Sequence, residues 1–401
     1  MAKAKKTEEK IKESTEGTKV PSRAESIRDT INEKNKGKTR LILASESDTP
    51  FHVRRPTGIT QIDIALAGGW PAATVCQLFG PPGTGKTYFA NRTIAEVQKN
   101  YGAAAKVACL SFGYQWDLEF ARQICGVSLP HSEAEVSRYA ELIRDIEGRS
   151  ITDEEIANLK SGIGEIYFIQ VEDLEHPAEA MMTAVLDIVK TAEFQLIIID
   201  ETNMAETQHG AGRTLEEADK VADQAGLLTR FFKKYFNAIN QRSASGKPNE
   251  TTILEILEVR SKISALSKGG YSQGGGNAMK HAKAVDLHLS SWQDYKVGDK
   301  VLGKEIEWYI DKGKMGVPEG ASGTVIFKHG YGVDTEMDLL NAAELHNLVE
   351  KSGAWYSMNG EKLGQGKEAV SRFLRSRPDI TDTLRTKVFG ASKIRPFLVR
   401  S

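Results

Sequence analysis

Residues 74–87 read TVCQLFGPPGTGKT and carry the strongest structural signal in the chain. An apolar strand pattern passes directly into a glycine-rich turn that fits G-x-x-x-x-G-K-[ST], and apolar residues at helical spacing follow over residues 90–97. Gly83 and Gly85 let the backbone turn successive N–H groups toward phosphate oxygens, at the positive N-terminal end of the helix. The stretch predicts a phosphate-binding loop made of Gly80, Gly83, Thr84, Gly85, Lys86 and Thr87.

Residue types at and near this loop predict a nucleotide and a metal. Lys86 would contact the β- and γ-phosphates of ATP, and the Thr87 hydroxyl would bind Mg²⁺. The apolar segment FQLIIID, residues 194–200, ends in Asp200, which a strand would place at its carboxyl edge beside the loop. We therefore expect Thr87 and Asp200 to hold Mg²⁺ and its water shell.

Strand and helix patterns alternate along the rest of the chain, which predicts a mostly parallel sheet covered by helices. Strand patterns occupy residues 106–112, 165–171, 194–200 and 251–259, and helical patterns occupy residues 177–190 and 222–240. The polar residues 130–164 are typical of a helical insertion between two strands. Beyond residue 332 the pattern changes, which indicates a small separate α/β domain.

Composition and charge exclude other classes of protein. The 401 residues exceed the roughly 250–300 that a single core usually reaches, so we expect one large domain with small appendages. Three cysteines in unrelated contexts do not suggest disulfides, and no histidines pair with them at zinc spacing. No apolar run approaches the ~20 residues that span a bilayer, so we expect a cytoplasmic protein without a membrane partner. The formal net charge of -1 neither demands nor excludes nucleic acid.

Three further stretches resemble the RecA family. The first, residues 57–71 (TGITQIDIALAGGWP), leads into the phosphate loop. The second, residues 273–282 (QGGGNAMKHA), is similar to the end of the family's second DNA-binding loop. The third, residues 353–367 (GAWYSMNGEKLGQGK), resembles the bacterial C-terminal domain. The resemblance covers residues 22–388. It implies an ATP-dependent homologous recombinase that forms filaments on single-stranded DNA and exchanges strands with duplex DNA, with DNA-stimulated ATP hydrolysis. The departures given below are compatible with a divergent member, such as one encoded by a bacteriophage.

The same resemblance implies an α/β fold: a RecA-type P-loop ATPase core with a mostly parallel central sheet, an N-terminal polymerisation helix and a small C-terminal α/β domain. Residues 22–34 place Ala24, Ile27 and Ile31 on a narrow apolar stripe. This helix would dock on the core of a neighbouring subunit, or it would be a simple surface helix. The expected segments are a flexible basic tail at 1–21, the polymerisation helix and linker at 22–50, the ATPase core with DNA-binding loops at 51–332, the C-terminal domain at 333–390 and a basic tail at 391–401.

Residues 259–285 contain no carboxylate, and their cations are interleaved with glycines. Basic side chains neutralise phosphates and aromatic rings stack on bases, so the pattern favours binding of single-stranded DNA. The resemblance to the second loop implies contacts from Arg260, Lys262, Lys268, Tyr271, Gly275, Gly276, Asn277 and Lys280. A first loop near residues 207–220 would contribute Arg213, although nearby carboxylates dilute its charge. For both loops the alternative is a surface without DNA contacts.

The chain departs from the family where hydrolysis is catalysed. The family's glutamate after the second core strand is missing from CLSFGYQWD, residues 109–117, and Gly113 stands in its place. Glu201, directly after Asp200, would instead be the base that positions water, or it would be an exposed acid. Glu258 replaces a glutamine that senses the γ-phosphate, and it would act through Mg²⁺ or water or alter the coupling.

Other family positions are matched. Lys312 and Lys314 in DKGKMGVP correspond to a lysine pair that reaches the neighbouring subunit's ATP, where cations stabilise charge on the transferred phosphoryl group. Asp117 and Phe120 correspond to positions that flank the adenine. Two rival functions stay open: a DNA-binding filament that uses ATP mainly as a structural ligand with weak hydrolysis, and a helicase or regulatory ATPase built on the same core.

Overall fold

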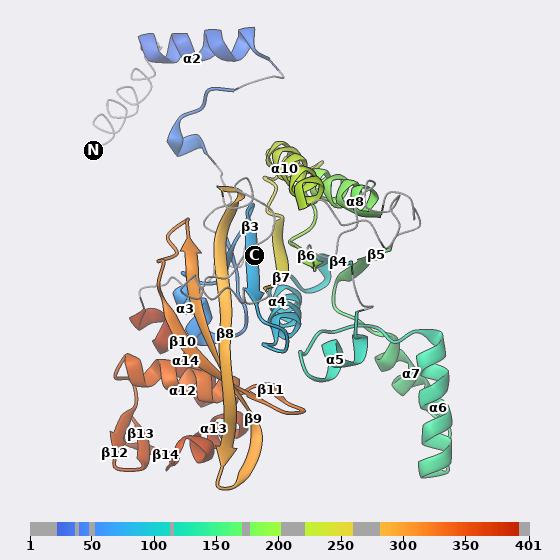
Figure 1. Ribbon diagram of the computed structural model, residues 1–401, viewed down its shortest axis with the longest axis vertical. Helices are drawn as coiled ribbons and strands as arrows, with labels where there is room; N and C mark the ends of the chain where they lie inside the picture. Colours follow the sequence, from blue (N-terminus) through green and yellow to red (C-terminus); the bar gives the residue numbers. More distant parts are fainter. Residues whose placement is uncertain are drawn as a thin grey trace, which may run out of the picture. The chain divides into compact units, whose positions relative to one another are not determined.

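The chain forms two compact units, Met1–Thr49 and Pro50–Ser401. The computed structural model of the protein is shown in Figure 1. It describes residues 22–36, 40–47, 53–112, 116–170, 177–201, 221–259 and 281–392.

Helix α2 (Arg23–Lys34) is the main element of the first unit, followed by a short 3-10 turn, η1 (Ala44–Glu46). Ser22 and Glu25 cap the helix reciprocally: the Glu25 N–H donates to the Ser22 hydroxyl at 3.2 Å, and the Ser22 N–H donates to the Glu25 carboxylate at 2.6 Å. The Ile27 and Ile31 side chains are 49% and 36% exposed, and no residue of the helix is buried. The expected helix is present, and its apolar stripe lies open within the described residues.

The second unit is built around a sheet whose described strands follow the order β11-β10-β9-β8-β3-β7-β6-β4-β5. Every neighbouring pair from β8 to β5 is parallel. The expected parallel strands are all present, as β3 (Val75–Gly80), β4 (Lys106–Ser111), β5 (Glu165–Ile169), β6 (Leu196–Asp200) and β7 (Thr252–Glu258). The expected mostly parallel central sheet is therefore confirmed.

An antiparallel extension widens this sheet beyond the parallel strands, as the long orange strands of Figure 1 show. β8 (Lys283–Val297) turns into β9 (Lys300–Gly313), and β10 (Ser322–Lys328) and β11 (Gly332–Val333) follow. Gly298, between β8 and β9, has a φ of 61°, the left-handed conformation that a tight connection between two strands favours. The sequence patterns did not identify this extension.

Helices cover both faces of the parallel strands. Val75 and Leu78 point to opposite faces of β3, because successive side chains of a strand alternate. Leu78 belongs to a core shared with α4 (Lys86–Tyr101), and Val75 belongs to a second core shared with α8 (Pro177–Thr191) and α10 (Val221–Ala238). Three smaller elements precede β3 and α4 in the described residues: β1 (Arg54–Arg55), α3 (Thr60–Ala65) and β2 (Trp70–Pro71). A short 3-10 turn, η3 (Gly102–Ala104), follows α4.

In the described residues between β4 and β5, the chain forms the helices α5 (Leu118–Gln123), α6 (Glu133–Glu147) and α7 (Asp153–Lys160). α6 and α7 each begin with a reciprocal cap, in which a hydroxyl residue pairs with a glutamate three positions later. The expected helical insertion at residues 130–164 is present.

The C-terminal residues form a small α/β region with its own hydrophobic cluster. Its elements are α12 (Thr335–Leu345), β12 (Glu350–Ser352), β13 (Trp355–Met358), β14 (Glu361–Gln365), α13 (Lys367–Ser376) and α14 (Pro378–Ala391). It belongs to the same compact unit as the sheet, and the Gln61 side chain of α3 donates to Asp338 of α12 at 2.8 Å. Within the described ranges, every helix is too short or too polar to cross a membrane.

Candidate nucleotide-binding site

A pocket of about 270 Å³ opens at the carboxyl edge of the parallel strands. The loop after β3, the ends of β6 and β7, and single residues of α5 and β10 form its wall. This edge is where open α/β sheets bind their ligands, because loops and helix N-termini meet there. The lining residues are Gly83, Gly85, Lys86, Thr87, Tyr88, Phe120, Asp200, Glu201, Glu258 and Phe327.

The glycines of the loop are required by its geometry. Gly83 and Gly85 have φ values of 74° and 83°, which residues with a Cβ adopt only under strain. A Cβ on Gly80 would lie 2.2 Å from the carbonyl oxygen of Leu289 in β8. Thr84, fully buried, closes the turn by donating its hydroxyl to the Pro81 carbonyl at 2.8 Å. The sequence therefore builds a tight loop whose backbone N–H groups suit phosphate oxygens.

Lys86 is the cation of the pocket and is buried. Its ammonium donates to the carbonyls of Gly80 at 3.1 Å and Pro81 at 2.9 Å, and lies 3.9 Å from a Glu258 carboxylate oxygen. Burial lowers the pKa of Lys86, while the carboxylates of Glu258, Glu201 and Asp200 act to raise it. The lysine is thus held against the loop by carbonyl and carboxylate oxygens, which are the contacts that phosphate oxygens could replace.

Thr87 and Asp200 meet across the pocket as the sequence predicted. The Thr87 hydroxyl donates to an Asp200 carboxylate oxygen at 3.3 Å. Burial raises the pKa of Asp200, which the Thr87 hydrogen bond and Lys86 partly oppose. Within the described residues no three His, Cys, Asp or Glu side chains are grouped to bind a metal by themselves. A hydroxyl and a carboxylate do fit Mg²⁺ that takes its remaining ligands from nucleotide and water.

Glu201 and Glu258 line the same pocket from the ends of β6 and β7. Burial raises the pKa of Glu201, and the neighbouring charges of Glu258 and Asp200 raise it further. Glu201 is half-buried rather than fully exposed. Among the residues that the structure describes, the pocket thus combines one buried cation, Lys86, with three carboxylates, a balance that suits a ligand carrying its own cation.

Aromatic rings form another part of the wall. Tyr88 contacts Phe120 and Phe327 with ring centroids 6.4 Å and 5.0 Å apart. Phe120 was predicted, whereas Tyr88 and Phe327 were not. Tyr88 follows the loop directly and could have been found from that position, but Phe327 comes from the antiparallel extension. Asp117 is exposed and caps α5 by accepting the Phe120 N–H at 2.9 Å, and it is not one of the lining residues.

The remaining predicted residues do not line this pocket. Lys312 and Lys314 lie at the end of β9, where the Lys314 ammonium donates to the carbonyl of His281 at 3.1 Å. Gly113 lies outside the described residues. So do all the predicted DNA contacts, namely Arg213, Arg260, Lys262, Lys268, Tyr271, Gly275, Gly276, Asn277 and Lys280.

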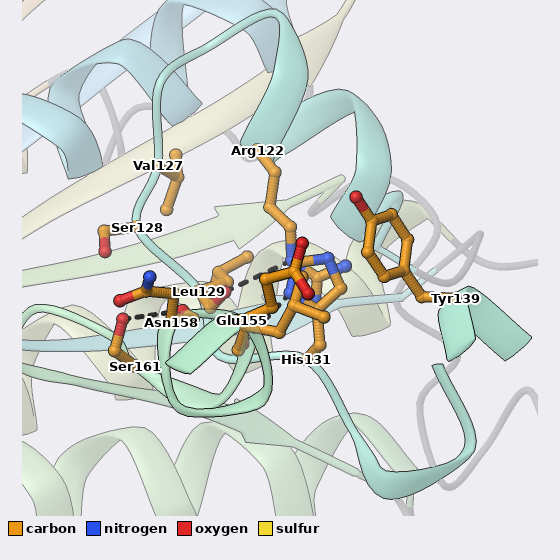
Figure 2. Close-up of a pocket in the computed structure, with 10 residues that line it drawn as sticks. Arg122, Val127, Ser128, Leu129, His131, Tyr139, Glu155, Asn158 and Ser161 are labelled. Atoms are coloured by element: carbon orange, nitrogen blue, oxygen red, sulfur yellow. Dashed lines mark hydrogen bonds between the residues drawn. The ribbon is translucent and has the colours of Figure 1, made fainter. Parts of the chain in front are cut away.

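A second pocket, of about 420 Å³, lies where α5 meets the insertion (Figure 2). Arg122 lies in its wall, together with His131, Tyr139 and Glu155. The Arg122 guanidinium is already engaged by Glu119, by Glu135 and by the carbonyls of Leu129 and Pro130. This cavity is larger than the first, but in the phosphate-loop pocket the backbone N–H groups of a glycine loop lie beside the cation, so that pocket is the better candidate for an anionic ligand.

Comparison with known families gives two matches. A model of the RecA N-terminal domain matches residues 25–132, which include the phosphate loop. A model of the RecA C-terminal domain matches residues 337–393, which include α13 and α14. The match to the N-terminal domain precedes the match to the C-terminal domain along the chain.

Curated proteins named Protein RecA are similar over most of the chain. That of Bdellovibrio bacteriovorus is 27% identical over 365 residues, covering 91% of this chain and 83% of its own. That of an Azoarcus strain is 27% identical, covering 89% of each chain. A crystal structure of the RadB recombinase shares 15% identity, covers 70% of this chain and 98% of its own, and gives a TM-score of 0.41. The chain is thus similar to the RecA N-terminal and C-terminal domains, in that order, and to RecA proteins over most of its length.

Proposed function

We propose that this chain is an ATP-dependent homologous recombinase. It forms filaments on single-stranded DNA and catalyses homologous pairing and strand exchange with duplex DNA, with ATP hydrolysis stimulated by DNA. The observation that supports this most is the convergence of Lys86, Thr87 and Asp200 at a glycine loop, in a chain that is similar to RecA proteins over most of its length. We expect the protein to act on DNA in the cytoplasm.

Each residue of the pocket has a proposed role in binding. Bound Mg²⁺-ATP supplies an electrophilic phosphorus and a metal that neutralises its charge. The loop N–H groups cradle the phosphates, and Lys86 exchanges its carbonyl contacts for phosphate oxygens. Thr87 and Asp200 hold the metal. Phe120 lies against the adenine, while Asp117 keeps the start of α5 in place as its cap.

Glu201 is the proposed base. It lines the pocket directly after Asp200, so its carboxylate lies beside the expected metal and within the wall that would surround the terminal phosphate. From there it would orient water and accept its proton. Glu258, 3.9 Å from the Lys86 ammonium, would lose this contact when phosphate takes the lysine, and it would report nucleotide binding in this way.

The other roles require a second protomer or DNA. Lys312 and Lys314 would stabilise charge on the phosphoryl group bound by the neighbouring subunit. The exposed stripe of α2 would dock on a neighbouring core. Residues 260–280, with Arg213, would contact DNA. The proposed divisions are tails at 1–21 and 391–401, a polymerisation segment at 22–50, the core at 51–332 and a C-terminal domain at 333–390.

A second function is favoured by one specific observation. Gly113 occupies the position of the family's catalytic glutamate. The chain could therefore use ATP mainly as a structural ligand that closes the filament and hydrolyse it weakly. The rival helicase or regulatory ATPase is less well supported, because a model of the RecA C-terminal domain matches residues 337–393 of this chain.

The test is strand exchange between circular single-stranded DNA and homologous linear duplex, with ATP and with a slowly hydrolysed analogue. ATP turnover is measured in parallel with and without single-stranded DNA. We expect joint molecules with both nucleotides and faster turnover with DNA. Exchange without DNA-stimulated turnover would favour the structural use of ATP. Absence of filaments and of joint molecules under all conditions would contradict both functions.

A further inference from the structure

A row of polar side chains crosses the middle of the central sheet. Glu255 of β7 is directly opposite Gln77 of β3, and Gln77 is directly opposite Asp286 of β8. Asp286 is in turn opposite Lys312 of β9. Residues paired across neighbouring strands share one face of a sheet, so these four side chains form one row. The row ends at a lysine that the proposed function places at the nucleotide of the neighbouring protomer.

Hydrogen bonds connect the buried part of this row. The Gln77 amide donates to Glu255 at 3.0 Å and accepts from the Lys283 ammonium at 2.6 Å. The same ammonium lies 3.0 Å from an Asp286 carboxylate oxygen, and the side chains of this ion pair are 1% and 5% exposed. Buried charges are costly unless they are paired, and pairing also fixes their position. Burial raises the pKa of Asp286 and the Lys283 ammonium acts to lower it, so Lys283 both favours the carboxylate and holds it in one place.

One oxygen of Asp286 is not used by this pair. Its Oδ2 contacts Lys283, whereas its buried Oδ1 has no hydrogen-bond partner. Directly opposite on β9 stands Lys312, which is half-buried. Burial and the charge of Lys314 lower the pKa of Lys312, and the carboxylate of Asp286 acts to raise it. Asp286 thus supplies a fixed negative charge beside Lys312, with an acceptor oxygen to spare.

We propose that Asp286 is a positioning residue for Lys312. Its carboxylate, fixed by Lys283, keeps the Lys312 ammonium protonated and near the end of β9, in place to act on a neighbouring nucleotide. The last step rests on the proposed function, whereas the placement of Lys312 by Asp286 does not. Lys314 has a different anchor, the His281 carbonyl.

The first test measures the reactivity of Lys312 in the nucleotide-free full chain. Trace acetylation at pH 8, quantified by mass spectrometry, reports the fraction of neutral amine relative to the exposed Lys99. In Asp286→Asn, loss of the nearby anion should increase Lys312 acetylation at least about twofold. Glu255→Gln is the matched control, because it neutralises a buried carboxylate of the same row two strands further away. It should leave Lys312 unchanged.

Removing one member of a buried ion pair can prevent folding, so a second variant is needed. Lys283→Met with Asp286→Asn removes both charges of the pair. Lys312 acetylation should again increase, though less, because Lys283 also repels Lys312. If Asp286→Asn folds and the reactivity of Lys312 is unchanged, the proposal is overturned. If Asp286→Asn does not fold, unchanged reactivity of Lys312 in the folded double variant overturns it.

The second test separates positioning from a structural role. DNA-stimulated turnover on oligo(dT) is measured for Asp286→Asn, Lys312→Ala and their combination. We expect Asp286→Asn to lower kcat roughly three- to tenfold in the otherwise unchanged chain and to have no further effect beside Lys312→Ala. The same loss in both backgrounds would mean a structural role and overturn the proposal. If the unaltered chain lacks DNA-stimulated turnover, the proposed function fails, and the acetylation result still decides the role of Asp286.

Discussion

The phosphate-loop pocket and the end of β9 are both rich in charge, but they differ in how much of their chemistry one chain provides. In the pocket, Lys86 lies against the loop carbonyls and Thr87 already contacts Asp200. At the end of β9, Lys312 is paired in register with Asp286, and the Lys314 ammonium donates to the His281 carbonyl. Neither lysine lines that pocket. One protomer thus brings together the groups that we propose bind a nucleotide, while in the proposed function Lys312 and Lys314 act at the nucleotide of the neighbouring protomer.

The largest effect on turnover is expected from Glu201→Gln, which alters the phosphate-loop pocket and leaves the end of β9 unchanged. If Glu201 is the base, turnover should fall roughly 10²- to 10⁴-fold, because the amide cannot accept a proton. ATP affinity, measured by equilibrium binding of a fluorescent analogue, should change little, since the amide keeps the shape of the side chain. Turnover close to that of the unaltered chain would show that another group activates water.

Lys312→Ala should have the next largest effect, and it should be confined to the polymer. Loss of a cation that stabilises the transferred phosphoryl group should lower turnover on DNA about 100-fold. Nucleotide binding by dilute chain without DNA should be unaffected, because Lys312 does not line its own pocket. Weakened binding in the dilute chain would instead place Lys312 at the nucleotide of its own protomer.

Gly80→Ala tests the loop itself. The added Cβ would lie 2.2 Å from the Leu289 carbonyl oxygen, so β3 and β8 would have to separate at the pocket. We expect about 1–3 kcal/mol lower stability in urea unfolding, together with weaker nucleotide binding. Gly102→Ala is a useful control, because its Cβ would meet no atom within 4 Å, although its φ of 56° adds a backbone strain that Gly80 does not have. Equal loss of nucleotide binding in both variants would show that the close approach to β8 is unimportant.

A further effect concerns a carboxyl group outside both regions, and it changes the pH dependence of stability rather than turnover. Burial raises the pKa of Asp338 from 3.8 to about 6, so the folded chain binds this proton more tightly than the unfolded chain. Its contribution to stability is present below about pH 4 and is lost as the pH rises through 6. Asp338→Asn should remove this loss, which we estimate at about 2–3 kcal/mol. Urea unfolding at pH 4, 5, 6 and 7 should show that the free energy of unfolding of Asp338→Asn depends less on pH than that of the unaltered chain. The same pH dependence in both chains would contradict a raised pKa of Asp338.

The sequence predicted the parallel strands and the phosphate loop well, because local patterns encode them. The spacing around Lys86 and the carboxylate after an apolar strand were sufficient to bring Thr87 and Asp200 together. The helix of residues 22–34 was equally local, since Ser22 and Glu25 specify its beginning. Each of these signals lies within a short window of sequence.

Features that depend on strand register could not be predicted in this way. Phe327 reaches the pocket only because β10 joins the antiparallel extension. The alignment of Gln77, Asp286 and Lys312 requires the pairing of three strands that are far apart in sequence. Glu258 was identified by its departure from the family, but its contact with Lys86 became evident only from the folded chain.

The central claim is that one protomer binds the nucleotide and the next supplies Lys312. Mixing two inactive variants, Glu201→Gln and Lys312→Ala, in equal amounts on oligo(dT) tests it most directly. In a head-to-tail polymer about a quarter of the interfaces would combine an intact Glu201 with an intact Lys312, so turnover should recover to about a quarter of that of the unaltered chain. A mixture no more active than either variant alone would contradict a shared site.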